Sequence, residues 1–385
     1  MRITTPRWTE GNGAGRAVAL EVLIHGPLSR SEVARRLDLS PGSLTRLATP
    51  LLQSGLLVEA GEQADGRVGR PQQLLDIVPG SRRFIGMKLM ADEVLGVTAD
   101  LRANVKASES RQLKATDPEA VVSTIAELAR SLARGMPEVT AIGIGVGGLI
   151  EAHGIVRSAP FLKWSDVSLG SMVEAATGIP TIIENDLVAF TEYEHWFGAG
   201  RGLDRFAVVT LGAGIGYGLV IHDEIVRNDD FGIGLIGHWP LDPFGQICSE
   251  GHRGCAKAIL TDSAITQSVS QALGKQVTYK AALNLAASGE PAARRIVDDA
   301  GRGLGRLLAA IANLTMPETV VLGGEGVRLA SVASEAVEAG LRADRDPRTA
   351  ALPLTIRSGD NVEWCRGAAV VAIQTFVLGH RTDDI

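Results

Sequence analysis

The chain has 385 residues, of which 45% are hydrophobic, and its 38 basic and 44 acidic side chains give a formal net charge of −6. The length suffices for two or three domains with a large core, and the hydrophobic share suits a soluble globular protein. The acidic balance argues against nucleic-acid binding over the whole surface.

No stretch of the sequence is long and apolar enough to cross a bilayer. The longest apolar run, near residues 368–378, is interrupted by Gln374. Residues 1–15 lack the apolar segment of a secretion signal, and three cysteines cannot form a disulfide framework. We therefore expect a cytoplasmic protein without a membrane partner.

Charge is distributed unevenly along the chain. Residues 1–80 hold nine Arg, no Lys and eight Asp or Glu, which gives them a net charge of +1. Since the whole chain has a net charge of −6, residues 81–385 carry −7. A weakly positive head on an acidic body is compatible with DNA binding through one face only. An ordinary surface charge distribution is the alternative.

The first part of the chain has the pattern of a helix-turn-helix unit. Helices are expected over 15–23, 30–37 and 41–54, and Ser40 precedes Pro41 as a favourable N-cap. The apolar positions expected to face inward are Val33, Ala34, Leu37, Leu39, Leu44, Leu47, Leu51 and Leu52. The side chains expected to face outward on the third helix, where they can bond base edges and phosphates, are Ser43, Thr45, Arg46 and Thr49.

A basic wing follows the third helix. Two strands are expected at 56–59 and 73–77, joined by the polar loop 60–71. Arg67 and Arg70 lie among glycines in that loop, and an extended arginine can enter a narrow minor groove. The sequence therefore predicts a winged helix-turn-helix that binds double-stranded DNA, with a protein-binding winged helix as the alternative. The predicted DNA contacts are Ser40, Ser43, Thr45, Arg46, Arg67 and Arg70.

Past Pro79, strands alternate with helices, which predicts an α/β architecture. The predicted strands are 84–89, 94–100, 141–146, 181–184 and 206–211. The predicted helices are 118–134, 169–176, 187–197, 294–313 and 366–377. The glycine-rich segment 198–202 separates two such series, so we expect two lobes around a cleft.

Several motifs occur together in one order, and they make the chain similar to a known family. They are the Gly69-Arg70-Pro71 wing, Glu184-Asn185-Asp186, the Gly212–Gly216 loop, Gly237-His238 and a cysteine-containing segment at 248–255. With them the chain resembles the ROK family, which groups sugar kinases of the actin-like ATPase fold with repressors that carry an added winged helix. The resemblance covers residues 17–380 and implies a two-lobed actin-like body in a homodimer or homotetramer.

On this basis we expect three domains. Residues 1–80 would form the winged helix, 81–200 the first actin-like lobe and 201–365 the second. The segment 366–380 is expected to pack back on the first lobe as a helix, and 238–255 in the second lobe is expected to bind a metal.

The resemblance implies a role for Asp186, because the Asp of this motif is the base in ROK kinases. Asn185 and Asp186 just before a helix would equally serve as a cap. Other positions at which ROK kinases bind sugar or phosphate differ in this chain, and they hold Lys88, Met90, Phe161, Leu235 and Lys257. Lys88 replaces an Asp that organises magnesium, and Met90 replaces a glycine that approaches phosphate.

We therefore predict that Asp186 is a vestigial base, that the chain is not a working kinase and that it does not bind ATP. The glycine loops Gly212–Gly216 and Gly323-Gly324 remain, but such turns need glycine whether or not they bind phosphate. A sugar kinase with an appended winged helix and unusual pocket residues is the alternative.

In ROK proteins a His and three Cys hold a structural zinc. The matching residues in this chain are His238, Cys248, Glu250 and Cys255, with Glu250 in place of the middle Cys and His252 nearby as a substitute. A carboxylate ligand would make zinc binding weaker and more sensitive to pH. A metal-free loop is the alternative.

Together these features predict a repressor of carbohydrate metabolism that binds an inverted-repeat operator and is released by a sugar or sugar phosphate in the lobe cleft. The predicted effector contacts are Lys88, Asn185, Asp186, His238 and Lys257. Lysines at positions where the family has acids favour an anionic effector. The alternatives are drift on a surface that binds no ligand and a body that docks another protein.

Overall fold

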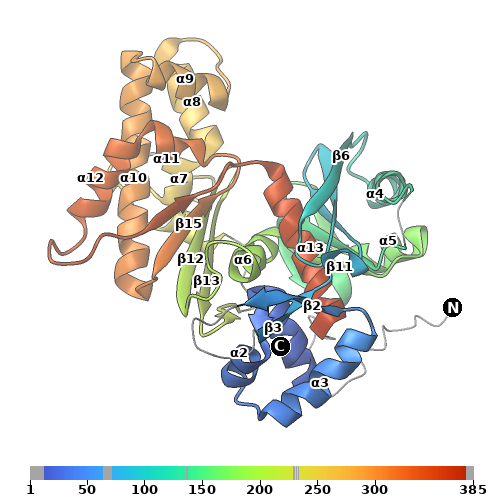
Figure 1. Ribbon diagram of the computed structural model, residues 1–385. Helices are drawn as coiled ribbons and strands as arrows, with labels where there is room; N and C mark the ends of the chain where they lie inside the picture. Colours follow the sequence, from blue (N-terminus) through green and yellow to red (C-terminus); the bar gives the residue numbers. More distant parts are fainter. Residues whose placement is uncertain are drawn as a thin grey trace. The chain divides into compact units, whose positions relative to one another are not determined.

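The computed structural model describes residues 13–63, 72–135, 138–228, 230, 232 and 234–378. The chain forms two compact units (Figure 1). Unit 1 runs up to Phe197 and resumes at Trp364, and unit 2 spans Gly198–Glu363. Among the described residues, no helix is both long enough and apolar enough to cross a membrane.

Unit 1 begins with a winged helix-turn-helix. Its elements are α1 (Gly13–His25), β1 (Leu28–Ser29), α2 (Arg30–Arg36), α3 (Pro41–Gln53), β2 (Leu57–Gln63) and β3 (Gln72–Ile77). The strands form a small sheet in the order β1-β3-β2, with both pairs antiparallel. Strand β2 continues four residues beyond the predicted end at residue 59, across an irregularity between Glu59 and Glu62.

The inward faces of α2 and α3 follow the predicted apolar pattern. Val33, Ala34, Leu44 and Leu51 are buried. The other predicted positions, Leu37, Leu39, Leu47 and Leu52, are partly buried against the same core. The sequence pattern missed Ala48, which is completely buried because its small side chain lets α3 approach its neighbours closely.

The rest of unit 1 is an α/β lobe. Its elements are η1 (Pro79–Ser81), β4 (Phe84–Leu89), β5 (Glu93–Ala99), β6 (Val105–Gln112), α4 (Pro118–Leu132), β7 (Ala141–Val146), β8 (Leu149–Glu151), η2 (Ala152–Gly154), β9 (Ile155–Ala159), β10 (Trp164–Val167), α5 (Leu169–Thr177), β11 (Thr181–Asn185), α6 (Asp186–Trp196) and α13 (Asn361–Leu378). The main sheet has the order β11-β7-β4-β5-β6. Strands β4, β7 and β11 are parallel, whereas β5 and β6 join antiparallel.

Unit 2 repeats this arrangement. Its elements are β12 (Arg205–Leu211), β13 (Ile215–Ile221), β14 (Glu224–Ile225), η3 (Leu235–His238), α7 (Ala256–Leu260), α8 (Asp262–Leu273), α9 (Tyr279–Ala287), α10 (Pro291–Thr315), β15 (Thr319–Gly323), α11 (Arg328–Val332), α12 (Ser334–Ala343) and β16 (Leu354–Ile356). The sheet order β14-β13-β12-β15-β16 matches that of unit 1 element for element, with the same parallel and antiparallel pairs. Two lobes with one topology confirm the predicted actin-like α/β body behind a winged helix.

Glycines let α13 lie directly on the main sheet of unit 1. A side chain at Gly86 on β4 would overlap the carbonyl oxygen of Cys365, and one at Gly143 on β7 would overlap that of Ala368. The helix also begins at Asn361, five residues before the predicted start. Trp364 and Cys365 are buried in this added turn, which explains why the helix extends there.

The winged helix and the lobe share one hydrophobic core. That core contains buried residues of the winged helix together with Phe84, Leu101, Tyr193, Trp196 and Ile373 of the lobe. In Figure 1 the blue winged helix accordingly lies against the C-terminal end of the red α13. The predicted boundary between residues 80 and 81 therefore falls inside a continuously packed unit.

A polar contact reinforces this junction. Arg102, in the turn between β5 and β6, donates to the carboxylate of Asp76 on β3 and to the carbonyl oxygens of Val22 (3.4 Å) and Gly26 (3.2 Å). One guanidinium thus joins the lobe to the end of α1 and to the wing sheet, and charge-assisted bonds of this kind are among the stronger ones in proteins.

Candidate functional site

Helix α3 presents the polar face expected of a DNA-reading helix. Ser40 caps it, accepting from the Ser43 N–H (3.2 Å) and donating to the Ser43 hydroxyl (2.9 Å). Thr45, Arg46 and Thr49 are exposed. Both threonine hydroxyls donate to the backbone one turn earlier, so they hold fixed orientations. Arg46 is thus an exposed cationic donor on the same helix face as two oriented hydroxyls.

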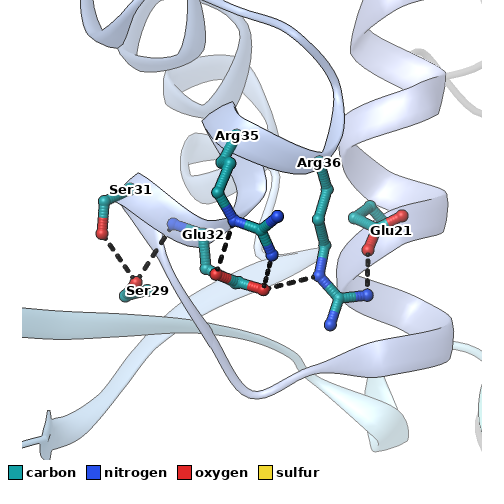
Figure 2. Close-up of polar contacts among 6 residues, drawn as sticks. All are labelled: Glu21, Ser29, Ser31, Glu32, Arg35 and Arg36. Carbon is teal, nitrogen blue, oxygen red and sulfur yellow. Dashed lines mark hydrogen bonds and ion pairs between the residues drawn. The ribbon is translucent and has the colours of Figure 1, made fainter.

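Helix α2 is held against α1 by a charged network (Figure 2). The Ser29 hydroxyl accepts from the Glu32 N–H at the start of the helix (3.2 Å). Glu32 then binds Arg35 (2.7 Å) and Arg36 (2.9 Å), and Arg36 reaches Glu21 on α1 (2.9 Å). Hydrogen bonds from Arg35 and then Arg36 lower the Glu32 pKa to about 2, so its charge persists at any ordinary pH.

The wing itself lies beyond the described part of the chain. Arg67 and Arg70 fall between the end of β2 and the start of β3, outside the described residues. The hairpin that leads into the loop is tied to α2, because Arg30 pairs with Glu59 on β2 (2.9 Å).

In unit 1, Asn185 serves as the cap of α6. It is 4% exposed, its side-chain oxygen accepts from the N–H groups of Leu187 (2.9 Å) and Val188 (3.2 Å), and its amide donates to the Gly148 carbonyl (2.8 Å). Of the two roles considered for this motif, Asn185 performs the capping role, and no bonding capacity on its oxygen is left pointing toward a ligand.

Asp186 forms an ion pair with Lys88. The Lys88 ammonium on β4 donates to the Asp186 carboxylate, and the two side chains are only 12% and 17% exposed. Lys88 also lies over the Trp364 ring, 4.6 Å from its centroid. A sugar hydroxyl that used Asp186 as its base would therefore have to share this carboxylate with the Lys88 ammonium.

Phe161 stands beside this pair. A side-chain carbon added at Gly147 would lie 3.3 Å from the Asp186 carboxylate and 3.9 Å from the Phe161 ring. The Phe161 ring and the Asp186 carboxylate therefore both lie next to Gly147. The ring is 58% exposed. An apolar, exposed ring therefore lies beside Asp186, at one of the positions at which this chain differs from ROK kinases.

In unit 2, two histidines and two cysteines come together. His238 Nδ1 lies 3.1 Å from His252 Nδ1, 3.8 Å from Cys248 Sγ and 4.0 Å from Cys255 Sγ. Potential ligand atoms of His238, Cys248 and His252 all lie within 4.8 Å of one another. Burial, and then the neighbouring His252, lower the His238 pKa, which favours the neutral imidazole.

Glu250, the predicted fourth ligand, has other partners. It accepts from the Lys257 ammonium (2.6 Å) and from the Ser249 hydroxyl (2.7 Å), and these bonds lower its pKa to about 2. His252, named from the sequence as a substitute for Glu250, lies in the cluster with His238 and Cys248. The sequence contained this residue but could not show how the loop 248–255 folds back on itself.

The two lysines expected to make the effector site positive are both paired with acids. Lys88 binds Asp186, and Lys257 binds Glu250. Leu235 is exposed at the start of η3, and Met90 is partly buried after β4. The sequence argument for an anionic effector therefore loses its support, because neither ammonium is an uncompensated charge.

Comparison with known proteins identifies relatives. Residues 85–374 match the model of the ROK family. The transcriptional repressor Mlc of Escherichia coli is 26% identical over 332 residues, covering 82% of each chain. The xylose repressor of Bacillus subtilis is 27% identical over 307 residues, covering 78% of this chain and 79% of its own.

Solved structures agree with the fold. A ROK family transcriptional regulator homologous to E. coli Mlc superposes with a TM-score of 0.80 at 24% identity, covering 95% of this chain and 98% of its own. A ROK family glucokinase from Streptomyces griseus, in complex with glucose and AMPPNP, gives a TM-score of 0.66 at 24% identity. It covers 75% of this chain and 98% of its own, so the regulator matches more of the chain than the kinase does.

The Lys88–Asp186 pair should contribute measurably to stability. We expect Lys88→Met and Asp186→Asn each to lower the free energy of unfolding by roughly 1–3 kcal/mol, because each leaves one poorly solvated charge without its partner. The double variant should lose less than the sum of the two, as measured by urea denaturation. The exposed pair Arg157–Glu151 of the same unit is the matched control and should show a coupling below about 1 kcal/mol. Additive losses at Lys88 and Asp186 would contradict the pairing.

Proposed function

This chain belongs to the ROK family, and from that we propose that it is a transcriptional repressor that binds an inverted-repeat DNA operator and is released by a sugar-derived effector. The observation that carries the proposal is a winged helix with an exposed Thr45–Arg46–Thr49 face, packed in one core with a ROK lobe. The repressor Mlc and the dual regulator NagC of E. coli and the xylose repressor of B. subtilis, each 26–28% identical, support it.

We assign sequence reading to α3. In a helix-turn-helix, the second helix enters the major groove with its N-terminal residues at the base edges. Ser43, Thr45 and Arg46 lie in the first half of α3, and the Ser40 cap adds a hydroxyl near the phosphates. Arg67 and Arg70 of the wing would reach an A·T-rich minor groove. A homodimer, or a tetramer built from dimers, would place two such heads on the two halves of an inverted repeat.

We infer that phosphoryl transfer has been lost. The residue in the base position, Asp186, is bound to Lys88, and Phe161 lies beside it. A sugar kinase with an added winged helix is the second candidate, favoured by the kinase neighbours in fold. ATP consumption in the presence of hexoses and amino sugars separates the two.

Effector contacts are proposed in each unit by itself, Lys88, Asn185 and Asp186 in unit 1 and His238 and Lys257 in unit 2. Relatives named for N-acetylglucosamine and xylose point to sugars. A sugar hydroxyl can donate to a carboxylate and accept from an ammonium at once, so the Lys88–Asp186 pair suits an uncharged sugar better than a sugar phosphate.

Helix α6 offers a route from this site to the DNA-binding head. It begins at Asp186 and ends at Trp196, which lies in the core shared with the winged helix. The Arg366 guanidinium, on α13, lies over the Tyr193 ring of α6, 4.3 Å from its centroid. A shift of α6 on effector binding would therefore change the contacts between α6 and the winged helix. An effector can release DNA only if it favours one such arrangement over another.

We propose that His238, Cys248, His252 and Cys255 hold a structural zinc. Tetrahedral zinc places nitrogen and sulfur ligands roughly 3.3–3.8 Å apart, close to the 3.1–4.0 Å separations from His238. Zinc would fix the loop between η3 and α7, and Glu250 would hold Lys257 beside it.

Arg46 tests the DNA-binding proposal. Selection of genomic fragments by the purified protein should enrich a small set of inverted repeats, and Arg46→Ala should weaken binding to them by about 1–3 kcal/mol, since a bidentate arginine contact to a base has that value. The exposed Arg342 on α12 of unit 2 is the matched control, and Arg342→Ala should enrich the same fragments. Uniform, salt-sensitive retention of all fragments would argue for a non-specific module instead.

Arg102 tests the junction between head and lobe. Arg102→Ala should lower the free energy of unfolding by about 1–3 kcal/mol, because Asp76 and two carbonyl groups lose a charged donor. The exposed Arg111–Glu109 pair of the same lobe provides the control, and Arg111→Ala should cost less than about 1 kcal/mol. Calorimetric unfolding measures both variants, and equal losses would speak against a special role for Arg102.

The zinc proposal predicts that His252 is a zinc ligand and that Glu250 is not. After dialysis against a competing chelator, His252→Ala should lose zinc at a concentration at which the unaltered protein and Glu250→Gln retain one ion per chain. Elemental analysis gives the metal content, and the melting temperature should fall with the metal. Zinc loss in Glu250→Gln but not in His252→Ala would show that the carboxylate is the ligand.

A further inference from the structure

The glycine loop of unit 2 already holds an acidic side chain of its own chain. Strand β12 ends at Leu211, and Gly212, Ala213 and Gly214 turn into β13. The Ala213 N–H donates to the Glu325 carboxylate (3.1 Å), and a side chain at Gly212 would overlap that carboxylate. Glu325 itself follows the end of β15, which pairs with β12.

The Glu325 carboxylate occupies a backbone N–H group of a kind that can bind an anion. Turns rich in glycine expose backbone N–H groups and allow close approach, so they bind anions such as phosphate. Here the oxygen of Glu325 takes the anion's place on the backbone. Both Ala213 and Glu325 are exposed, so a phosphate from solvent that bound the Ala213 N–H would have to displace the carboxylate.

The surrounding backbone keeps the loop and Glu325 together. The Gly326 N–H donates to the Leu211 carbonyl (2.8 Å), and the Asp262 N–H donates to the Gly212 carbonyl (3.0 Å). At Gly324, φ is +84°, a conformation that favours glycine, and a side chain there would overlap the Leu211 carbonyl. These main-chain contacts hold the backbone of residues 324–326 next to the turn, within reach of the Glu325 side chain.

A second acid lies beside the turn. Asp262, the first residue of α8, has a buried carboxylate oxygen without a hydrogen-bond partner among the described residues. Burial, followed by the nearby charge of Glu325, raises the Asp262 pKa to about 7. The turn that follows β12 therefore has two acids close to it, and the charge of Glu325 acts on both the turn and Asp262.

We propose that Glu325 is a built-in anion that closes the glycine loop of unit 2 to nucleotide phosphates, so that the protein does not respond to ATP. The inference rests on the proposed loss of phosphoryl transfer and assigns a residue that enforces it within unit 2. It makes Glu325 a determinant of ligand specificity, separate from the Lys88–Asp186 pair of unit 1.

Equilibrium binding of ATP and ADP to the full chain, with and without magnesium, tests this proposal. Glu325→Ala should bind nucleotide at least about tenfold more tightly than the unaltered protein, since it removes both the charge and the blocking group. Glu325→Gln keeps the size and removes the charge. Tighter binding by both variants identifies charge as the block, and tighter binding by Glu325→Ala alone identifies size.

Glu318 supplies a matched control. It precedes β15 as Glu325 follows it, and its carboxylate likewise accepts from a backbone N–H at the other end of β12, that of Arg205 (3.1 Å). Glu318→Ala should leave nucleotide binding unchanged. Equal melting temperatures of the variants show that each is folded, and Glu325→Gln keeps the test available if Glu325→Ala is unstable.

Three results would overturn the proposal. The first is that the unaltered protein binds nucleotide as tightly as Glu325→Ala does. The second is that neither Glu325 variant binds nucleotide more tightly than the unaltered protein. The third is magnesium-dependent nucleotide binding that is lost when Glu325 is replaced. Operator binding by the same preparations keeps the two hypotheses distinct. Failure to select DNA would refute the repressor, whereas a failure of the nucleotide test alone would leave the repressor proposal intact.

Discussion

The hydrophobic core shared by the winged helix and the first lobe is the constraint on which the rest of unit 1 depends. Phe84, Leu101 and Trp196 of the lobe are buried in it together with Val18 and Leu44 of the head. Full burial of a large apolar side chain contributes about 1.5–3 kcal/mol, so separating the two parts would be costly. The winged helix is therefore packed firmly on the lobe, and Tyr193 and Trp196 of α6 are part of the core that joins them.

A second feature is that charged side chains near the predicted ligand-binding positions are paired with groups of the same chain. Lys88 binds Asp186, Lys257 binds Glu250, and Glu325 occupies the turn at Ala213. Each pairing is local, and none requires a ligand. The chain thus keeps the ROK fold, and within it these charged groups are engaged in local contacts.

The sequence predicted the elements with strong periodicity and missed what depends on tertiary contacts. Helix α3, strand β7 and the repeated α/β pattern followed from apolar spacing and caps. Strand β6 was missed because its alternating surface is polar, and its residues are only partly buried or exposed. The partners of Lys88, Glu250 and Glu325 could not be predicted, because each pair joins segments whose proximity only the folded chain creates.

Native-state hydrogen exchange on the full chain tests the shared core most directly. If the head and the lobe form one cooperative unit, the slowest amides of α1 and α3 should open with the same free energy as those of β4, α6 and α13. Their protection should also fall in parallel as denaturant is added. Amides of α1 and α3 that exchange through a separate opening of lower free energy would show that the head moves independently, and would contradict the account.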